Sequence, residues 1–351
     1  MSISPDALIH PGCRIENSSI GPGCQIGAEG PVVMENCQLG RGVQLKGGTF
    51  SGAVFLDGAN MGPGAHVRAG TILEEQAGGA HTVGLKQTVL LPFVTLGSLI
   101  NFCDILMAGG TSRKDHSEVG SSYIHFNFTP NQDKATASLI GDVPRGVLLG
   151  EKPVFLGGQG GLIGPARIAY GSVIAAGGIC RKDILEEGML HVPAASAEKT
   201  APFEAGRYGD IDRVVKNNLI YIGNIRALKA WYENVRALFI RDEYDEAVHN
   251  GAIANLDLIL NERFQRLEQL AENVSKAWKQ AEPAPFNLSK HWKDEVDTMA
   301  SSSLMTDIEA ADKSDYLAAI QNLGTGARAA ATAWLQSIVD ETADLQNLRR
   351  L

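Results

Sequence analysis

The clearest pattern in the chain is an apolar residue that returns every six positions through its first half. Runs with this spacing include Phe55, Met61, Val67 and Leu73, and later Leu162, Ile168, Ile174 and Cys180. Glycine often follows the apolar position, as in Ile20-Gly21 and Ile163-Gly164. A period of six fits neither an α-helix nor a hairpin, and it is typical of the hexapeptide repeats of a parallel β-helix. We therefore expect a solenoid in which three hexads make one triangular coil.

The pattern changes near residue 207, where glycine becomes sparse and apolar residues adopt helical spacing. The segment 191–206 contains Pro193, Pro202 and several small polar residues, and it is predicted to be a linker. We therefore predict a mainly β plus α fold with a β-helix over 1–190, this linker, and an all-α domain over 207–351. Prolines at 283 and 285 interrupt the helices, and further helices are expected at about 287–302, 305–322 and 326–349.

Bulk properties narrow the class of protein. The 351 residues favour two domains, and a net charge of −9 argues against nucleic acid or an anionic membrane surface as the main partner. The five cysteines are scattered singly without a CxxC pair, as in a reduced cytosolic protein. No basic leader and no apolar run long enough to cross a bilayer is present, so we expect a cytoplasmic protein without a membrane span.

Arg68 and Lys86 lie eighteen residues apart within the hexad series. Because eighteen residues complete one coil, the two side chains should stack in one column, separated by about 4.8 Å, the distance between neighbouring strands. Two stacked cations repel each other unless an anion lies close by. The spacing therefore predicts a site for a phosphate or carboxylate ligand. The simpler alternative is that the two long side chains extend over a solvent-exposed face.

Between about residues 50 and 185, a series of segments resembles one enzyme family in order and spacing. The segments are Val67-Arg68-Ala69-Gly70, Gly84-Leu85-Lys86, Val119-Gly120-Ser121-Ser122, Asn127-Phe128-Thr129-Pro130 with Lys134, Ile140-Gly141-Asp142, and Ile174-Ala175-Ala176-Gly177. They are similar to the acetyltransferase half of the bacterial bifunctional UDP-N-acetylglucosamine pyrophosphorylase/glucosamine-1-phosphate N-acetyltransferase.

This resemblance implies a left-handed β-helix that assembles as a homotrimer with sites between subunits. It also implies that Arg68 and Lys86 hold a sugar phosphate and that Asn127 and Lys134 complete the substrate site. Ala175 and Ala176 would flank acetyl-coenzyme A, the acyl donor. The function that it implies is acetyl transfer to an amino-sugar phosphate.

The chain also departs from the family. Phe102 follows Asn101 where the family has its catalytic histidine, and Phe128 and Thr129 replace a Tyr-Asp pair. The family's pyrophosphorylase half has no match in this sequence. The predicted helical domain, in turn, has no counterpart in the family. Because the ordinary pKa of histidine is about 6.5, a histidine can accept a proton from an amine near neutral pH. His116 and His125 are therefore the candidate bases. The alternatives are a solvated loop residue for His116 and a coil-face residue bonded to a backbone carbonyl for His125.

Two other functions fit the same repeat. A silent sugar-phosphate or sugar-nucleotide scaffold would explain the phenylalanine at the histidine position. A zinc site like that of carbonic-anhydrase-type hexapeptide proteins would use His81, His116 and His125, but their spacing alone does not make a tetrahedral set. No metal is therefore predicted.

Overall fold

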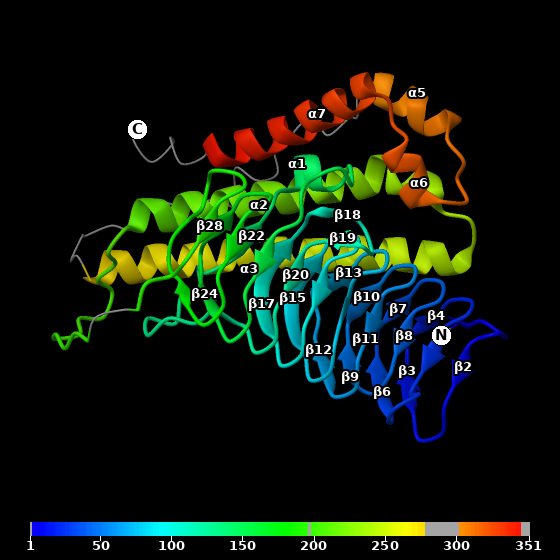
Figure 1. Cartoon of the computed structure of the whole chain (residues 1–351), viewed down its shortest axis with the longest axis horizontal. Helices are drawn as coiled ribbons and strands as arrows, with labels where there is room; N and C mark the ends of the chain where they lie inside the picture. The colour runs from blue at the N-terminus through cyan, green and yellow to red at the C-terminus, as the bar shows by residue number, and fades with distance from the viewer. Residues whose placement is uncertain (1, 196–197, 278–301, 345–351) are drawn as a thin grey trace.

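The computed structural model describes residues 2–195, 198–277 and 302–344. It shows a parallel β-helix with helices packed along one side (Figure 1), which confirms the predicted fold class. The chain winds around three faces, and each face is a stack of short parallel strands. We number the faces in the order in which the chain enters them, and name each edge by the two faces that it joins.

Each coil from β1 to β27 contributes one short stretch of strand to each face, and the last coil adds β28 and an isolated bridge at Ile184. Face 1 contains β1 (Ser2–Ile3), β4 (Ser19–Ile20), β7 (Gln38–Leu39), β10 (Ala53–Phe55), β13 (Thr71–Leu73), the second halves of β15 (Gly84–Leu90) and β17 (Asn101–Met107), β22 (Ser138–Ile140) and β25 (Arg167–Ile168). Face 2 contains β2 (Leu8–Ile9), β5 (Gln25–Ile26), β8 (Gln44–Leu45), β11 (Asn60–Met61), β14 (Gly78–Gly79), β16 (Thr95–Leu96), β20 (Glu118–Val119), β23 (Phe155–Leu156), β26 (Val173–Ile174) and β28 (Leu190–His191). Face 3 contains β3 (Arg14–Glu16), β6 (Val32–Glu35), β9 (Gly48–Ser51), β12 (Ala65–Val67), the first halves of β15 and β17, β21 (Ile124–Phe126), β24 (Gly161–Ile163) and β27 (Ile179–Cys180).

Two short insertions leave the coils. A hairpin of β18 (Gly110–Ser112) and β19 (Asp115–His116) protrudes at the edge between faces 1 and 2. The one-turn helix α1 (Val143–Gly146) follows face 1 one coil later.

Apolar columns fill the interior of the solenoid because successive coils stack in register. On face 1 one such column is formed by Ile20, Leu39, Phe55, Leu73, Leu90, Met107, Ile140 and Ile168. All of these side chains are buried. The hexad pattern thus marks the inward positions, as the sequence predicted.

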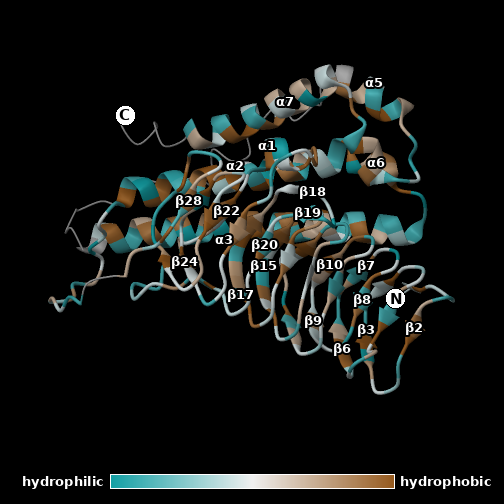
Figure 2. Ribbon diagram, in the orientation of Figure 1, coloured by the Kyte–Doolittle hydropathy of each residue, from teal (hydrophilic) through white to brown (hydrophobic). Residues whose placement is uncertain are grey.

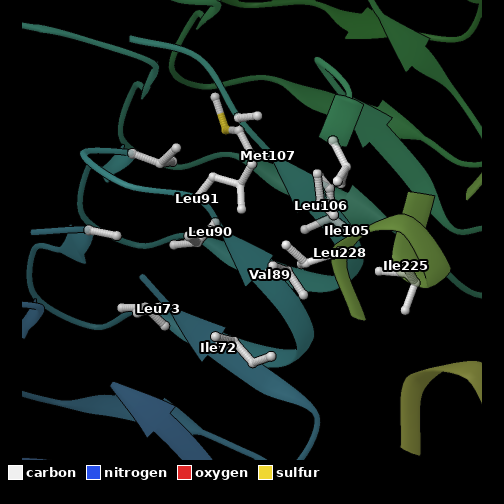
Figure 3. Close-up of a cluster of buried hydrophobic side chains, with 14 of the residues drawn as sticks. Ile72, Leu73, Val89, Leu90, Leu91, Ile105, Leu106, Met107, Ile225 and Leu228 are labelled. Atoms are coloured by element: carbon white, nitrogen blue, oxygen red, sulfur yellow. The ribbon is translucent and has the colours of Figure 1, made fainter. Parts of the chain in front are cut away.

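Face 1 differs from the other two because its outward side chains are apolar as well. Its outer column contains Val54, Ile72, Val89, Leu106 and Leu139, and all five are buried. Figure 3 shows Ile225 and Leu228 of the helical part beside Val89, Ile105 and Leu106 of this face. A sheet that is buried on both sides reads as continuous apolar runs, and face 1 follows that rule.

The helical part forms two layers over face 1. Its elements are α2 (Ile211–Asn234), the 3-10 helix η1 (Arg236–Phe239), α3 (Glu243–Ala277), α5 (Ser302–Ala310), α6 (Tyr316–Gln321) and α7 (Thr325–Asp344). The helix α3 packs on β4, β7, β10 and β13, while α2 packs on β22 and beside α3. The outer helix α7 rests on α2 and α1. In Figure 2 these helices alternate hydrophobic and hydrophilic residues, as expected for elements with one buried side.

Two of the three helices predicted beyond residue 286 can be compared with the structure. The helix expected at about 326–349 is observed as α7, Thr325–Asp344, up to the last described residue. The single helix expected at 305–322 was wrong, because α5 and α6 are separate. Asp315 caps α6 by accepting a hydrogen bond from the Ala318 backbone, which starts a new helix there. The helix expected at 287–302 lies almost entirely outside the described residues.

Polar side chains of α3 bind the backbone at the edge between faces 3 and 1. The Asn255 side chain accepts a hydrogen bond from the Gly70 backbone N–H at 3.2 Å. It also donates to the carbonyls of Gly52 and Thr71 at 3.1 and 3.3 Å. At this corner Gly52 and Gly70 have φ of 59° and 75°, the left-handed backbone that glycine tolerates best. One buried amide therefore joins the helix to two coils.

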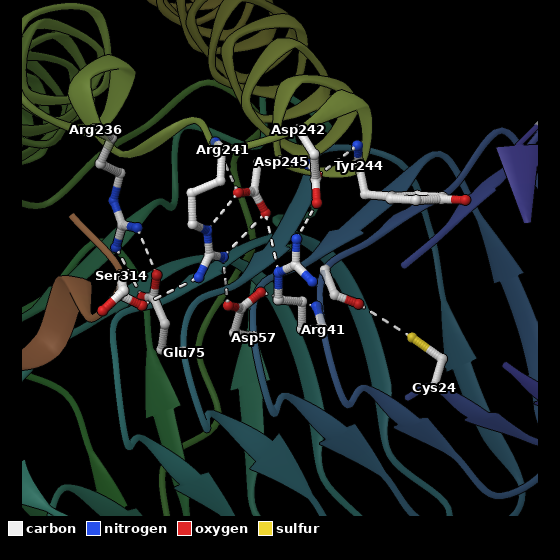
Figure 4. A network of polar contacts seen from close by, with 11 residues as sticks. Cys24, Arg41, Asp57, Glu75, Arg236, Arg241, Asp242, Tyr244, Asp245 and Ser314 are labelled. Atoms are coloured by element: carbon white, nitrogen blue, oxygen red, sulfur yellow. Dashed lines mark hydrogen bonds and ion pairs between the residues drawn. The ribbon is translucent and has the colours of Figure 1, made fainter. Parts of the chain in front are cut away.

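A network of buried and half-buried ion pairs holds the opposite edge of face 1, between faces 1 and 2 (Figure 4). The buried Arg236 guanidinium contacts Glu74 at 2.8 Å and Glu75 at 2.7 Å. Arg241 pairs with Asp57 and Asp245, and Arg41 pairs with Asp242. Tyr232 donates a hydrogen bond to Glu74 at 2.8 Å. Burial raises the pKa of Glu74 to about 7, although Arg236 opposes that shift.

Asn255→Ala should destabilise the protein by about 2–4 kcal/mol, because three buried backbone groups would lose their partner. Asn250→Ala is the matched control on the exposed side of the same helix, and it should change stability by less than about 0.5 kcal/mol. The measurement is the free energy of unfolding in urea. Equal stabilities of the two variants would show that the helix does not depend on this contact.

Glu74→Gln should make stability less sensitive to pH. Because the pKa of Glu74 is raised in the folded state, its contribution is fully present below the unfolded pKa of about 4.3 and is lost as pH rises towards about 7. The variant should therefore gain stability relative to wild type between pH 5 and pH 7.5, as urea midpoints would show. Glu16→Gln, at an exposed residue, is the control, and parallel pH curves for wild type and Glu74→Gln would contradict the prediction.

Candidate functional site

Arg68 and Lys86 occupy neighbouring rungs at the edge between faces 3 and 1. Val67 pairs with Leu85, and the Arg68 backbone N–H donates to the Leu85 carbonyl at 2.9 Å. Lys86 in turn pairs with Cys103 on the next coil. Arg68 is exposed, Lys86 is half-buried and Cys103 is buried. The predicted eighteen-residue register is therefore observed, and we call Arg68, Lys86 and Cys103 the cation column.

No carboxylate pairs with either cation among the ion pairs of the described residues. The Arg68 guanidinium instead donates to the Cys103 sulfur at 3.7 Å. Burial and the neighbouring Asp104 raise the pKa of the Cys103 thiol, although Arg68 and Lys86 oppose that shift. The thiol is therefore no counterion for them. At about 5 Å in water two like charges repel by about 0.8 kcal/mol, so a bound anion would stabilise this arrangement.

The helix α3 forms one wall of this edge. Its Arg263 is buried and donates to Asp104 at 2.8 Å and to Gln87 at 3.0 Å. The residue before it, Glu262, pairs at 2.7 Å with Arg266, one turn further along α3. Burial opposes ionisation of the Glu262 carboxyl group. The positive charges of Arg266, Arg263 and Lys86 outweigh this effect, so the pKa of Glu262 is lowered. Glu262 therefore stays charged close to Lys86.

Asn127 and Lys134 lie at the same edge as the cation column. The Asn127 side chain donates to Asp104 at 2.9 Å, and the Lys134 carbonyl accepts from Arg263 at 3.3 Å. All four residues predicted for the substrate therefore lie at one edge of the solenoid, and Asn127 and Lys134 contact Asp104 and Arg263 there. The Asn127 amide is already engaged by a carboxylate, whereas no hydrogen bond from the Lys134 ammonium group is observed in the described structure.

The two histidines predicted as bases lie elsewhere. His125 points into the solenoid, where one ring nitrogen contacts the Cys103 carbonyl at 2.5 Å and the other the Ser138 hydroxyl at 2.8 Å. Burial lowers the pKa of His125 to about 4. His116 belongs to the hairpin at the edge between faces 1 and 2. The width of face 1, about 15 Å for five residues, separates that edge from the cation column.

Phe102, at the position of the family's histidine, is buried inside the solenoid and packs edge-on against Tyr123 with ring centroids 6.3 Å apart. Ala175 and Ala176 lie at the third edge, between faces 2 and 3, where the Ala175 backbone N–H donates to the His191 carbonyl at 2.9 Å. Ala176 is exposed. The predicted acyl-donor residues and the predicted phosphate residues therefore lie on opposite edges of face 3.

A cavity of about 240 Å³ lies beside the ion-pair network at the edge between faces 1 and 2. It is lined by Arg236, Arg241, Tyr232, Tyr316 and Lys313 among others. Its guanidinium groups are already paired with Glu75, Asp57 and Asp245. We therefore assign no ligand to it.

Sequence reasoning missed the contribution of α3 and of His66. Arg263 lies 159 residues from Asp104 in the chain, and no motif signals that pairing. His66 precedes Arg68 by two positions in β12 and is exposed. Strand alternation alone places the two side chains on the same side of face 3, so that signal was available.

Comparisons with known proteins agree with this architecture. The fold is that of a hexapeptide-repeat parallel β-helix. Similar curated proteins are the Bifunctional protein GlmU of Pelobacter propionicus, 29% identical over 184 residues, and that of Geotalea uraniireducens, 28% identical over 199 residues. The matches cover 52% and 56% of this chain but only 36% and 39% of the relatives. The solenoid is therefore a GlmU-like β-helix domain, and the chain matches well under half the length of these relatives.

Other comparisons add less. No family model matches the chain. The solved structure of an Arabidopsis UDP-N-acetylglucosamine acyltransferase aligns with 80% of this chain and 98% of its own, at 14% identity and a TM-score of 0.26, which is too low to carry an argument. Among the described residues there is no cluster of three or more potential metal ligands. None of the described helices is long and apolar enough to span a bilayer.

Proposed function

We propose that this protein is an acyltransferase-like protein that binds an amino-sugar phosphate at the cation column. The observation that carries the proposal is the stack of Arg68 on Lys86, to which no carboxylate in the described part of the chain is paired. Phosphate oxygens accept charge-assisted hydrogen bonds from both side chains and relieve their repulsion. The similarity to the Bifunctional protein GlmU supports the same class of ligand. Lys134, at the same edge, adds a further positive charge.

In this proposal the acyl donor is acetyl-coenzyme A, and it binds beside Ala175 and Ala176. Those residues lie at the opposite edge of face 3 from Arg68 and Lys86, and several coils further along the stack. A donor at the edge of one copy can meet an acceptor at the edge of a neighbouring copy, which favours a homotrimer. Exposed apolar residues on the last coils support such packing, since Phe155, Val173 and Leu190 form one outward column on face 2.

The second candidate function is a binding scaffold without catalysis. The burial of Phe102 and His125 inside the solenoid favours it, because neither the position of the family's histidine nor the candidate base His125 offers a base to a ligand at the cation column. Thiol release from acetyl-coenzyme A in the presence of glucosamine 1-phosphate distinguishes the two functions. Turnover that depends on Arg68 supports the transferase, whereas binding without turnover supports the scaffold.

Arg68→Ala and Lys86→Ala should each weaken binding of glucosamine 1-phosphate about tenfold or more, because a charge-assisted hydrogen bond contributes about 1.5–3 kcal/mol. Isothermal titration calorimetry measures the affinity. Arg14→Ala is the matched control, an exposed arginine on the same face far from the column, and it should bind like wild type. If wild type binds no sugar phosphate, or all three variants bind equally, the proposed function is wrong.

Glu262→Gln should strengthen sugar-phosphate binding about two- to fivefold, because the charged carboxylate near Lys86 repels the incoming anion and competes for the cation. Glu246→Gln removes the same charge from an exposed position of α3 away from the column, and should leave the affinity unchanged. An unchanged affinity for Glu262→Gln as well would show that α3 does not act on the site.

A further inference from the structure

Next to the cation column on face 3, Gly84 has no side chain, and we call the space that this leaves the recess. Backbone pairing places His66, Gly84 and Asn101 on three successive rungs. Each stands two residues before Arg68, Lys86 and Cys103, respectively, so both columns face outward on the same side of the sheet. Gly84, in the middle, has no side chain. The polar side chains of His66 and Asn101 therefore lie on either side of a gap.

The position of Gly84 could hold a small side chain without strain. A Cβ atom added there would meet only the Asn101 side-chain oxygen at 3.6 Å and the Ile100 carbonyl at 3.9 Å, which are ordinary contacts. Most glycines of the coils are tighter, as at Gly62, where the same atom would lie 2.7 Å from the Ala80 backbone. The absence of a side chain at Gly84 is therefore not required by packing, and it leaves space beside Lys86.

The two groups that border the recess are unengaged. His66 and Asn101 are both exposed. Neither ring nitrogen of His66 has a hydrogen-bond partner in the part of the chain that the structure describes, and the Asn101 oxygen receives only a weak contact from the Cys103 thiol at 4.0 Å. His125 has both ring nitrogens occupied. His66 thus has the free nitrogens that the buried histidine lacks.

The spacing of the two columns matches one small ligand. Two residues along a strand span about 6.6 Å, so a phosphate at Arg68 and Lys86 places the rest of a monosaccharide over Gly84. An amino or hydroxyl group of that sugar then lies within reach of His66 or Asn101. The charged groups around His66 on its own strand and the next are Arg68 and Lys86, while its neighbour on β9 is Thr49.

We infer that His66 faces the bound sugar phosphate and is the proton acceptor for acyl transfer, with Asn101 orienting the sugar. This inference rests on the proposed function. The amine nitrogen of the sugar forms a bond to the thioester carbonyl carbon, and the carbon–sulfur bond breaks. The proton lost by the amine passes to His66, which returns it to the departing thiolate of coenzyme A. An amide and a free thiol result, with no other reactant.

The first test asks whether the ligand contacts His66. The ring-proton NMR signals of the histidines are monitored during titration with glucosamine 1-phosphate. The His66 signal is assigned as the one that is absent from the spectrum of the His66→Gln variant. It should move with the same midpoint as the calorimetric binding curve, while the signal of His81, exposed at the edge between faces 2 and 3, stays in place. A stationary His66 signal during Arg68-dependent binding would overturn the inference and leave the proposed function intact.

The second test is kinetic. His66→Gln should lower kcat for thiol release about a hundredfold or more with KM changed less than about threefold, because general-base catalysis contributes about 10²–10⁴ in rate. Added imidazole should restore part of the rate in His66→Ala, which a purely structural role would not produce. His81→Gln should behave like wild type.

The outcomes separate the two proposals. Binding that moves the His66 signal without thiol release in wild type would overturn the proton-acceptor role. No binding of glucosamine 1-phosphate by wild type would overturn the proposed function and, with it, this inference.

Discussion

Burial of the outer side of face 1 is the interaction on which the rest of the structure depends. The strands of this face carry apolar side chains both inward and outward, as in the columns through Leu73 and Ile72. Leaving the outer column in water would expose a continuous apolar strip, and burial of such area is the main favourable term in folding. The helices α2 and α3 therefore belong to the core of the solenoid, and they are not a separate attachment beside it.

Apolar contact alone would allow the helices to slide along the strip, and polar contacts at its two edges prevent this. Asn255 and Arg263 bind the edge between faces 3 and 1, where the backbone turns with positive φ and cannot satisfy all of its own groups. Tyr232 and Arg236 bind Glu74 and Glu75 at the other edge. Because unsatisfied buried polar groups are costly, each pairing fixes one register of helix on coil.

That register also explains why the candidate site lies where the two parts meet. The edge that Arg263 binds through Asp104 is the edge on which Arg68 and Lys86 stack. The same helix therefore places Glu262, which is paired with Arg266, near Lys86. A ligand at the column would lie beside both a coil corner and α3, so the helical part covers face 1 and also borders the candidate site.

The sequence by itself determined the solenoid, its position in the chain and the stacking of Arg68 on Lys86. These features depend on local spacing, since a six-residue period repeats the same corner geometry in every coil. Tertiary structure alone decided that α3 covers face 1, that Arg263 reaches Asp104, and that the His125 ring is held between the Cys103 carbonyl and the Ser138 hydroxyl. Contacts between segments more than a hundred residues apart follow from which buried groups find partners, and no spacing along the chain records that choice.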